Sequence, residues 1–306
     1  MAYMENPSNF DLINSLVKTY DANVQREIIK ARRCFVIDAC SFEFYKKVHR
    51  REAFTEYIKA NNACVVIFRT ILMELAGDNG LLEEEQIDFI EYLFRAGVSV
   101  YVLYEEDIFA LLQIYTDNKS INQYLKHAVL CIKQPTGIIN NLFSKNESLK
   151  SLIVHADRNS DASIYQQFFQ NLRGEKQHED NLGEIVCLIC IHIMANMEEM
   201  NPYKYVFLTE DTTAVILAKK VIHNSRRHRS GDTEMIGTVR ATNVIEKMYK
   251  MSILKDAKEI EAFLDKYPGN VRVLIKVEYE PEVKDESLSI KDFAKFICEG
   301  EGHIIL

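Results

Sequence analysis

Short apolar runs alternate with longer amphipathic segments through most of the chain. The runs are rich in β-branched residues and predict five strands, at 34–39, 64–72, 98–104, 204–210 and 234–242. The segments between them predict helices, at 8–33, 42–61, 73–97 with a break at Gly77–Gly80, most of 105–183, 184–195, 212–224 and 243–251. Strands that alternate with helices predict an α/β fold, in which helices flank a parallel sheet.

The pattern changes after about residue 255. The stretch "NVRVLIKVEYEP" at 270–281 alternates apolar and polar residues, as a half-exposed strand does, and a helix and the terminal "HIIL" follow it. We therefore expect two parts. Residues 1–255 form the main α/β domain, with an N-terminal helix and a helical insertion, and residues 256–306 form an appended α+β extension.

Charge and cysteine content narrow the class of protein. The chain of 306 residues has 37 Lys+Arg against 45 Asp+Glu, a net charge of −8, so any contact with nucleic acid must be made by a local patch. Seven cysteines in apolar segments are typical of reduced thiols, which predicts a cytoplasmic location. The longest apolar run, at 185–195, is too short to span a bilayer and predicts a buried helix, so no membrane contact is expected.

Four carboxylates stand at the expected carboxyl ends of strands or at the start of the buried helix. They are Asp38, Glu74, Glu184 and Asp211. Each one alone also has a structural explanation, because Asp38 and Asp211 could cap helices and Glu74 and Glu184 could stabilise a first helical turn. Together they would repel one another without a cation, and hard oxygen ligands select Mg²⁺ or Mn²⁺.

The motifs around these acids resemble a known family. "VIDAC", "ILMEL", "LGEIVCLICIHIMA" and "FLTEDTTAVILAKK" are similar, in the same order, to the four acidic motifs of PIN-domain nucleases, over about residues 34–250. The resemblance implies a PIN-like fold and carries the catalytic, metal-binding roles to Asp38, Glu74, Glu184 and Asp211. Asp180 competes with Glu184 for the third position. The segment before Glu184 is longer than in small members of the family, and the first helix and the tail lie outside its usual core.

The resemblance also implies an activity, which is metal-dependent hydrolysis of phosphodiester bonds, usually in RNA, by an endoribonuclease. Thr209 would orient Asp211 or a metal-bound water, or else cap the turn. The basic stretch "HNSRRHRSGD" places Arg226, Arg227 and Arg229 after the helix that follows Asp211, where they would bind the substrate backbone or form a solvated loop.

Other interpretations remain beside the nuclease. A non-catalytic PIN-like module would bind or scaffold a partner, and either form could have a regulatory protein partner or self-associate. A haloacid-dehalogenase-type phosphatase needs a second acid two residues after the first, where this chain has Cys40. Cys187 and Cys190 have no second pair for a zinc site, so we expect them, with His192, to belong to the core.

Overall fold

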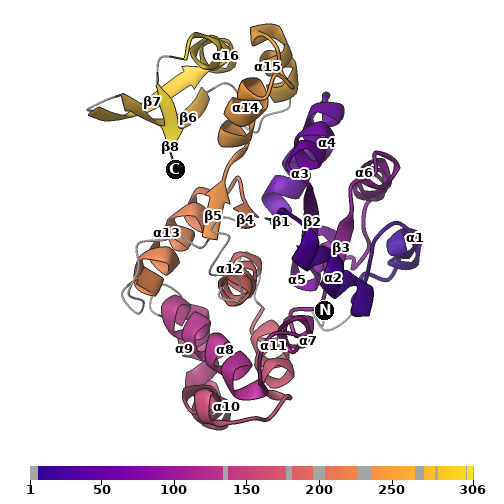
Figure 1. The fold of residues 1–306 in the computed structure, drawn as a ribbon, viewed down its shortest axis with the longest axis vertical. Helices are drawn as coiled ribbons and strands as arrows, with labels where there is room; N and C mark the ends of the chain where they lie inside the picture. Colours follow the sequence, from indigo (N-terminus) through magenta and orange to yellow (C-terminus); the bar gives the residue numbers. More distant parts are fainter. Residues whose placement is uncertain are drawn as a thin grey trace.

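The computed structural model describes residues 6–133, 137–176, 181–195, 204–226, 236–265, 272–279, 282–300 and 302–305. Within these ranges five parallel strands form one sheet in the order β3–β2–β1–β4–β5 (Figure 1). The strands are β1 (Arg33–Ile37), β2 (Ala63–Phe68), β3 (Val100–Leu103), β4 (Tyr205–Leu208) and β5 (Ile236–Val239). The predicted α/β class is confirmed at this level, and the PIN-like assignment stays a prediction.

The strand order reverses between β1 and β4. The chain builds outward from β1 to β2 and β3, and then returns to lay β4 and β5 on the other side of β1. The ends of β1 and β4 are aligned, because Ile37 pairs with Leu208 and the Asp38 amide donates to the Leu208 carbonyl over 3.2 Å. In open parallel sheets such a reversal point is where ligands bind, at the carboxyl ends of the strands.

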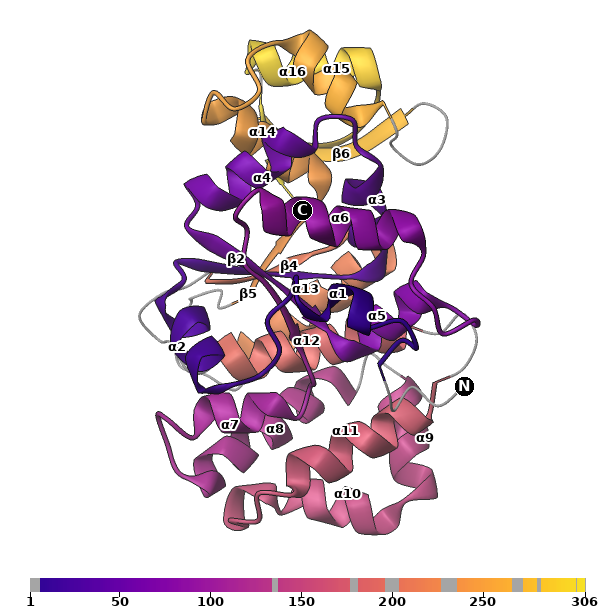
Figure 2. The ribbon, with the colours of Figure 1, turned by 90° about the vertical axis from the view of Figure 1, so that its right-hand side faces the viewer.

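Helices cover both faces of the sheet. Right-handed crossovers place most helices that connect β1 to β3 on one face and those that connect β3 to β5 on the other. The first face carries α3 (Ala39–Lys47), α4 (Arg51–Ala60) and α6 (Glu84–Arg95), and the second carries α12 (Leu182–Ala195) and α13 (Thr212–Arg226). The short helix α5 (Arg69–Ala76) contacts both α3 and α12. Figure 2 shows α4 and α6 on one side of the sheet and α12 on the other.

The insertion between β3 and α12 is helical, as the sequence predicts. It comprises α7 (Asp107–Leu112), α8 (Asn118–Lys133), α9 (Gly137–Lys145), α10 (Glu147–Val154), the 3₁₀-helix η1 (Ala156–Arg158) and α11 (Ile164–Gly174). These helices form a further layer beyond α12 (Figure 2). Because the sheet lies on one side of α12 and the insertion on the other, every residue of α12 except Glu184 is buried.

The N-terminal segment corrects one prediction. Residues 8–33 do not form one helix but two short ones, α1 (Asp11–Asn14) and α2 (Ala22–Lys30). Between them the chain is extended along β3, where the Lys18 amide donates to the Val100 carbonyl over 2.9 Å and the Val102 amide donates to the Lys18 carbonyl over 3.0 Å. The Asp21 side chain then caps α2. The segment therefore covers part of the sheet edge formed by β3, which would otherwise be open.

Two other predicted boundaries are also wrong. Residues 42–61 form two helices, because Val48 is extended and the Arg51 guanidinium donates to the Lys46 carbonyl at the end of α3. Residues 69–72 belong to α5 rather than to β2, since the chain becomes helical directly after Phe68. The remaining ends of β1, β3 and β4 differ from the prediction by one or two residues.

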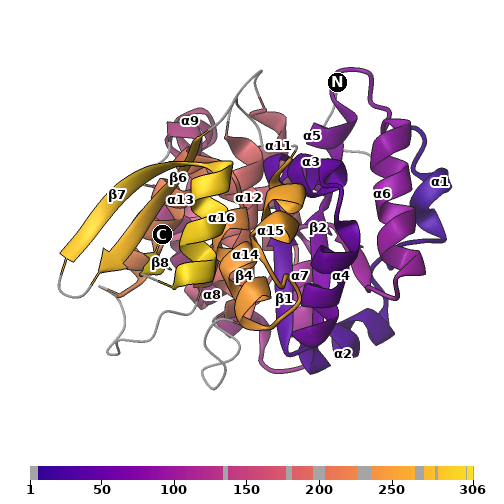
Figure 3. The same ribbon diagram turned by 90° about the horizontal axis from the view of Figure 1, so that it is seen from above.

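The C-terminal extension has an antiparallel sheet in the order β7–β6–β8, seen beside α16 in Figure 3. Its elements are α15 (Ala257–Leu264), β6 (Arg272–Tyr279), β7 (Glu282–Ser289), α16 (Ile290–Glu299) and β8 (His303–Ile305). Burial alternates along β6, as predicted. The preceding helix α14 (Ala241–Lys250) contacts both β5 and β8, and its Asn243 side chain donates to the Ile304 carbonyl over 3.3 Å. The domain boundary at 255 stays a prediction.

Candidate functional site

Asp38 occupies the end of β1 and begins α3. Its Oδ1 accepts a hydrogen bond from the Ser41 amide over 2.7 Å, so the predicted capping role is real. That role accounts for one oxygen only. The side chain is buried, with 1% exposure, and Oδ2 makes no hydrogen bond of ordinary geometry within the described part of the chain, although the Thr209 and Ser41 hydroxyls lie near enough to the carboxyl group to lower its pKa. A buried carboxylate oxygen without a donor is costly unless a proton or a cation meets it.

Asp211 lies just beyond the neighbouring strand β4. Its Oδ1 accepts from the amides of Thr213 and Ala214 in the first turn of α13. Its own amide donates to the Thr209 hydroxyl over 3.1 Å, and Thr209 is fully buried. Thr209 also interacts with the Asp38 carboxyl group and lowers its pKa. Thr209 therefore links the two aspartates, and its predicted contact with substrate stays a prediction.

Glu74 lies in the last turn of α5 and forms an ion pair with a lysine. Its Oε1 is 2.7 Å from the Lys176 ammonium and accepts the Gly183 amide over 3.2 Å. A side chain at Gly183 would collide with the Glu74 carboxylate and with Ile71 Cδ1, which would lie 2.7 Å from a Cβ atom there. Glycine at 183 thus lets the start of α12 approach Glu74. Lys176, which is distant from Glu74 in sequence, thus supplies a cation of the protein itself at one of the four acids.

Glu184 stands in the first turn of α12. Its Oε2 is buried and makes no hydrogen bond within the described residues. Burial, with smaller contributions from the charges of Glu74, Asp38 and Asp211, raises the pKa of the Glu184 carboxyl group to about 7. Burial likewise raises the pKa of Asp38 to about 6, with a smaller contribution from the charge of Asp211. Both carboxyl groups are therefore held in surroundings that disfavour their ionised forms.

The charges of all four carboxylates act on Cys40, in the first turn of α3. Desolvation and then the charges of all four raise the pKa of the Cys40 thiol to about 12. The same edge of the sheet thus holds four acids from β1, α5, α12 and β4. Within the described residues, however, no three of them have oxygen atoms inside 4.8 Å of one another. In this arrangement they do not meet at the distances of direct ligation to one ion.

Other predicted groups fall at the border of the described chain or beyond it. Arg226 is the last residue of α13, while Arg227, Arg229 and Asp180 lie outside the described residues. The substrate-binding role of the arginines and the choice between Asp180 and Glu184 stay predictions.

Sequence reasoning missed a second acidic group after β3. Glu105 is fully buried, accepts from the Thr70 amide and hydroxyl, and lies 2.5 Å from the Arg173 guanidinium, which also pairs with Glu106. The signal was the run "EED" that follows the third predicted strand. Arg173 at the end of α11 thereby ties the helical insertion to α5, three residues before Lys176 reaches Glu74.

Comparisons with protein-family models, with curated proteins and with solved structures give no match. Among the helices of the described ranges, none combines the length and the apolar character needed to cross a membrane.

Proposed function

We propose that this protein is a divalent-metal-dependent nuclease that hydrolyses phosphodiester bonds, with RNA as its substrate. The observation that supports this most is the buried Asp38 carboxylate. One of its oxygens makes no hydrogen bond of ordinary geometry within the described chain, it faces the charge of Asp211, and it lies where the strand order of the sheet reverses. A group that served only as a helix cap would not need this second oxygen in a buried, acidic surrounding.

The donor set fits Mg²⁺ or Mn²⁺. Asp38, Glu74, Glu184 and Asp211 offer carboxylate oxygens only, which hard cations prefer. Since no three of these oxygens lie within 4.8 Å of one another in the described residues, an ion there would be held by one or two carboxylates directly and by others through water, as Mg²⁺ usually is. When bound, the ion would lower the pKa of a water molecule and stabilise the leaving oxygen of the phosphodiester.

The chain's own residues would orient the acids and bind the substrate. Thr209 fixes the spacing of Asp38 and Asp211, because its hydroxyl accepts the Asp211 amide and it adjoins the Asp38 carboxyl group. Lys176 holds Glu74 and offsets its charge. The substrate phosphates would be bound by Arg226, Arg227 and Arg229. An acidic protein needs such a local basic patch to attract phosphates.

One observation favours the second candidate, a non-catalytic module that binds a protein partner or a second copy of itself. The ion pair between Lys176 and Glu74 already satisfies one of the four acids. In a scaffold, this ion pair would be permanent, and the acidic edge, the edge of the sheet that carries the four carboxylates, would have only a structural role.

The test is cleavage of labelled RNA and of single-stranded DNA by the full chain, with Mg²⁺, with Mn²⁺ or with EDTA. We expect cleavage of RNA with either metal, none with EDTA, and none by Asp38→Asn. The matched control is Asp256→Asn, because Asp256 caps α15 through the third amide of the helix as Asp38 caps α3, but on an exposed surface. Metal-independent cleavage, or equal cleavage by the parent and Asp38→Asn, would exclude the carboxylate site. No cleavage of either substrate under all conditions would favour the scaffold.

A further inference from the structure

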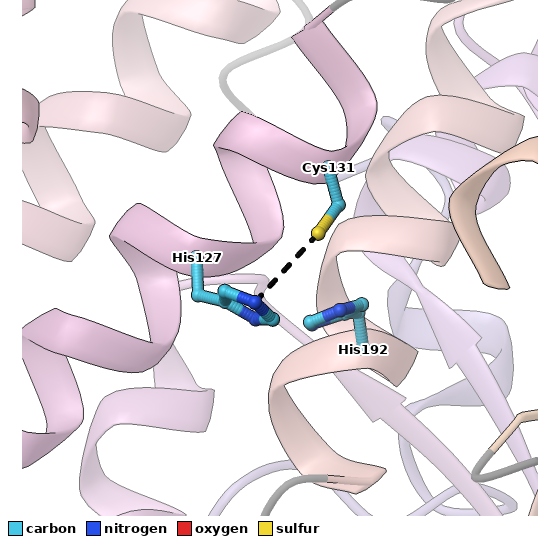
Figure 4. A group of neighbouring side chains, drawn as sticks. All are labelled: His127, Cys131 and His192. Atoms are coloured by element: carbon cyan, nitrogen blue, oxygen red, sulfur yellow. Dashed lines mark hydrogen bonds between the residues drawn. The ribbon is translucent and has the colours of Figure 1, made fainter. Parts of the chain in front are cut away.

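A second group of metal-ligand side chains lies apart from the carboxylates, between α8 and α12. His127 and Cys131 come from α8 and His192 from α12, and the three side chains point toward one another (Figure 4). Within the described residues, their donor atoms all lie within 4.8 Å of one another. Cys131 and His192 are buried and His127 is half-buried. The sequence predicted only a core role for His192.

The backbone presents these donors in a way that suits ligation. His127 and Cys131 are four residues apart on one helix, so their side chains share a face one turn apart. His192 meets them from the facing helix, and its ring centroid lies 5.0 Å from that of His127. The Asn224 side chain of α13 donates to the Cys131 carbonyl over 2.9 Å, so a third helix holds the turn that carries the cysteine. Paired helices in bundles build metal sites in this way.

The distances are close to those of a tetrahedral site. With Zn–N near 2.0–2.1 Å and Zn–S near 2.3 Å, tetrahedral angles require N···S separations of about 3.6 Å and N···N separations of about 3.4 Å. The Cys131 Sγ atom lies 3.9 Å from His127 Nε2, so a movement of a few tenths of an ångström brings this pair to ligation distance. The third donor lies within 4.8 Å and needs a movement that imidazole rotation supplies.

The donor chemistry selects zinc rather than magnesium. Two imidazoles and one thiolate are borderline-soft ligands, whereas the carboxylates around Cys40 are hard ones. Glu184 and His192 both lie on α12, eight residues apart, which is about 12 Å along a helix. The two sets of donors therefore belong to separate sites.

We propose that His127, Cys131 and His192 bind one Zn²⁺ ion, with water as the fourth ligand on the half-buried side of His127. The ion would join the helical insertion to the buried helix α12 and stabilise their packing. The inference does not depend on the proposed nuclease activity, since it rests on different residues and a different metal.

The first experiment measures zinc content. The full chain is expressed with added zinc, dialysed, and analysed for metal per chain. We expect one equivalent in the parent and in Asp38→Asn, and loss of zinc in Cys131→Ser and His192→Asn. The control variants Cys298→Ser and His155→Asn should keep it, because these residues lie elsewhere, in α16 and at the exposed end of α10.

The second experiment does not depend on whether a variant folds well. Co²⁺ added to metal-free parent protein should give the charge-transfer absorption of a thiolate–cobalt bond and the visible bands of a four-coordinate ion. Zn²⁺ should displace it, and a hundredfold excess of zinc over its Kd should raise the Tm of the parent by roughly 5 °C. Mg²⁺ should cause neither change. The variant His127→Asn tests the same site with the least risk to packing, because His127 is only half-buried.

A parent protein that takes up neither Zn²⁺ nor Co²⁺ would overturn the proposal, and the three side chains would then form a thiol–imidazole contact in the core. Retention of zinc and of the cobalt–thiolate absorption by Cys131→Ser would overturn it as well. Loss of nuclease activity in a protein that still binds zinc would count only against the carboxylate site, so the two proposals can fail separately.

Discussion

Replacing Asp38 with asparagine should stabilise the metal-free protein at neutral and higher pH. Burial raises the pKa of Asp38 from 3.8 to about 6. One pKa unit corresponds to about 1.4 kcal/mol, so the ionised side chain lowers the free energy of unfolding by about 3 kcal/mol. Asparagine carries no charge, is nearly isosteric and caps helices as well as aspartate does. We therefore expect Asp38→Asn to gain most of that amount.

The gain should depend on pH in a defined direction. Below about pH 4 the carboxyl group is protonated in both the folded and the unfolded chain, and the variant should match the parent. As the pH rises from about 4 to about 6, the unfolded chain releases its proton first, so the parent loses stability relative to the variant. Above about pH 6 the folded carboxyl group is ionised too, and the difference should stay constant near its full value.

Urea denaturation in EDTA at about pH 4, 6 and 8 measures this difference. The variant Asp256→Asn supplies the control, since it changes the same capping contact on an exposed helix and should show no comparable rise with pH. Mg²⁺ should reverse the order at about pH 8, because it stabilises the parent by mass action and leaves Asp38→Asn nearly unchanged. A difference between Asp38→Asn and the parent that is flat across this pH range would refute the reasoning.

Three further predictions concern the other acids and their neighbours. Glu184→Gln should stabilise the metal-free chain above about pH 7 but not below about pH 4, because burial raises the pKa of Glu184 to about 7. Equal urea midpoints for the variant and the parent at both pH values would contradict this. Lys176→Met should tighten Mg²⁺ binding by about tenfold in calorimetric titration, since the ammonium competes for Glu74; an unchanged Kd would show that the pair does not oppose the metal. Gly183→Ala should lower the free energy of unfolding by roughly 1–3 kcal/mol in thermal melts, and adding Glu74→Ala should restore part of that loss. Strict additivity of the two changes would rule out a contact between residue 183 and Glu74.

The sequence predicted the strands and the buried helix α12 because their signals are local. An apolar run such as "CFVI" or "VCLICIHIM" must be covered wherever it lies, and an aspartate directly after a buried run marks the end of that run. The same reasoning placed Asp38 and Asp211 at the carboxyl ends of their strands, which a parallel sheet brings to one edge, whereas the pairing of β1 with β4 was not predicted.

The features that the sequence did not predict depend on contacts between distant residues. Lys176 meets Glu74 from the end of the insertion, and nothing in the polar stretch around it indicates which acid it will reach. His192 has apolar neighbours along α12, so its pattern is that of a core residue; only the packing of α8 shows that His127 and Cys131 face it. The break between α3 and α4 likewise depends on the Arg51 side chain, which no apolar periodicity encodes.

The burial of α12 has a consequence for how the acidic edge can move. A helix covered on both sides cannot shift without exposing apolar surface to water, so its amide protons should exchange only when the whole molecule opens. Glu184 is carried by this helix and is therefore held nearly still. Lys176, which follows α11, is also mostly buried, and its ion pair with Glu74 joins the insertion to the acidic edge. The position of Glu184 is thus fixed by the core, while that of Glu74 depends on a contact from the insertion.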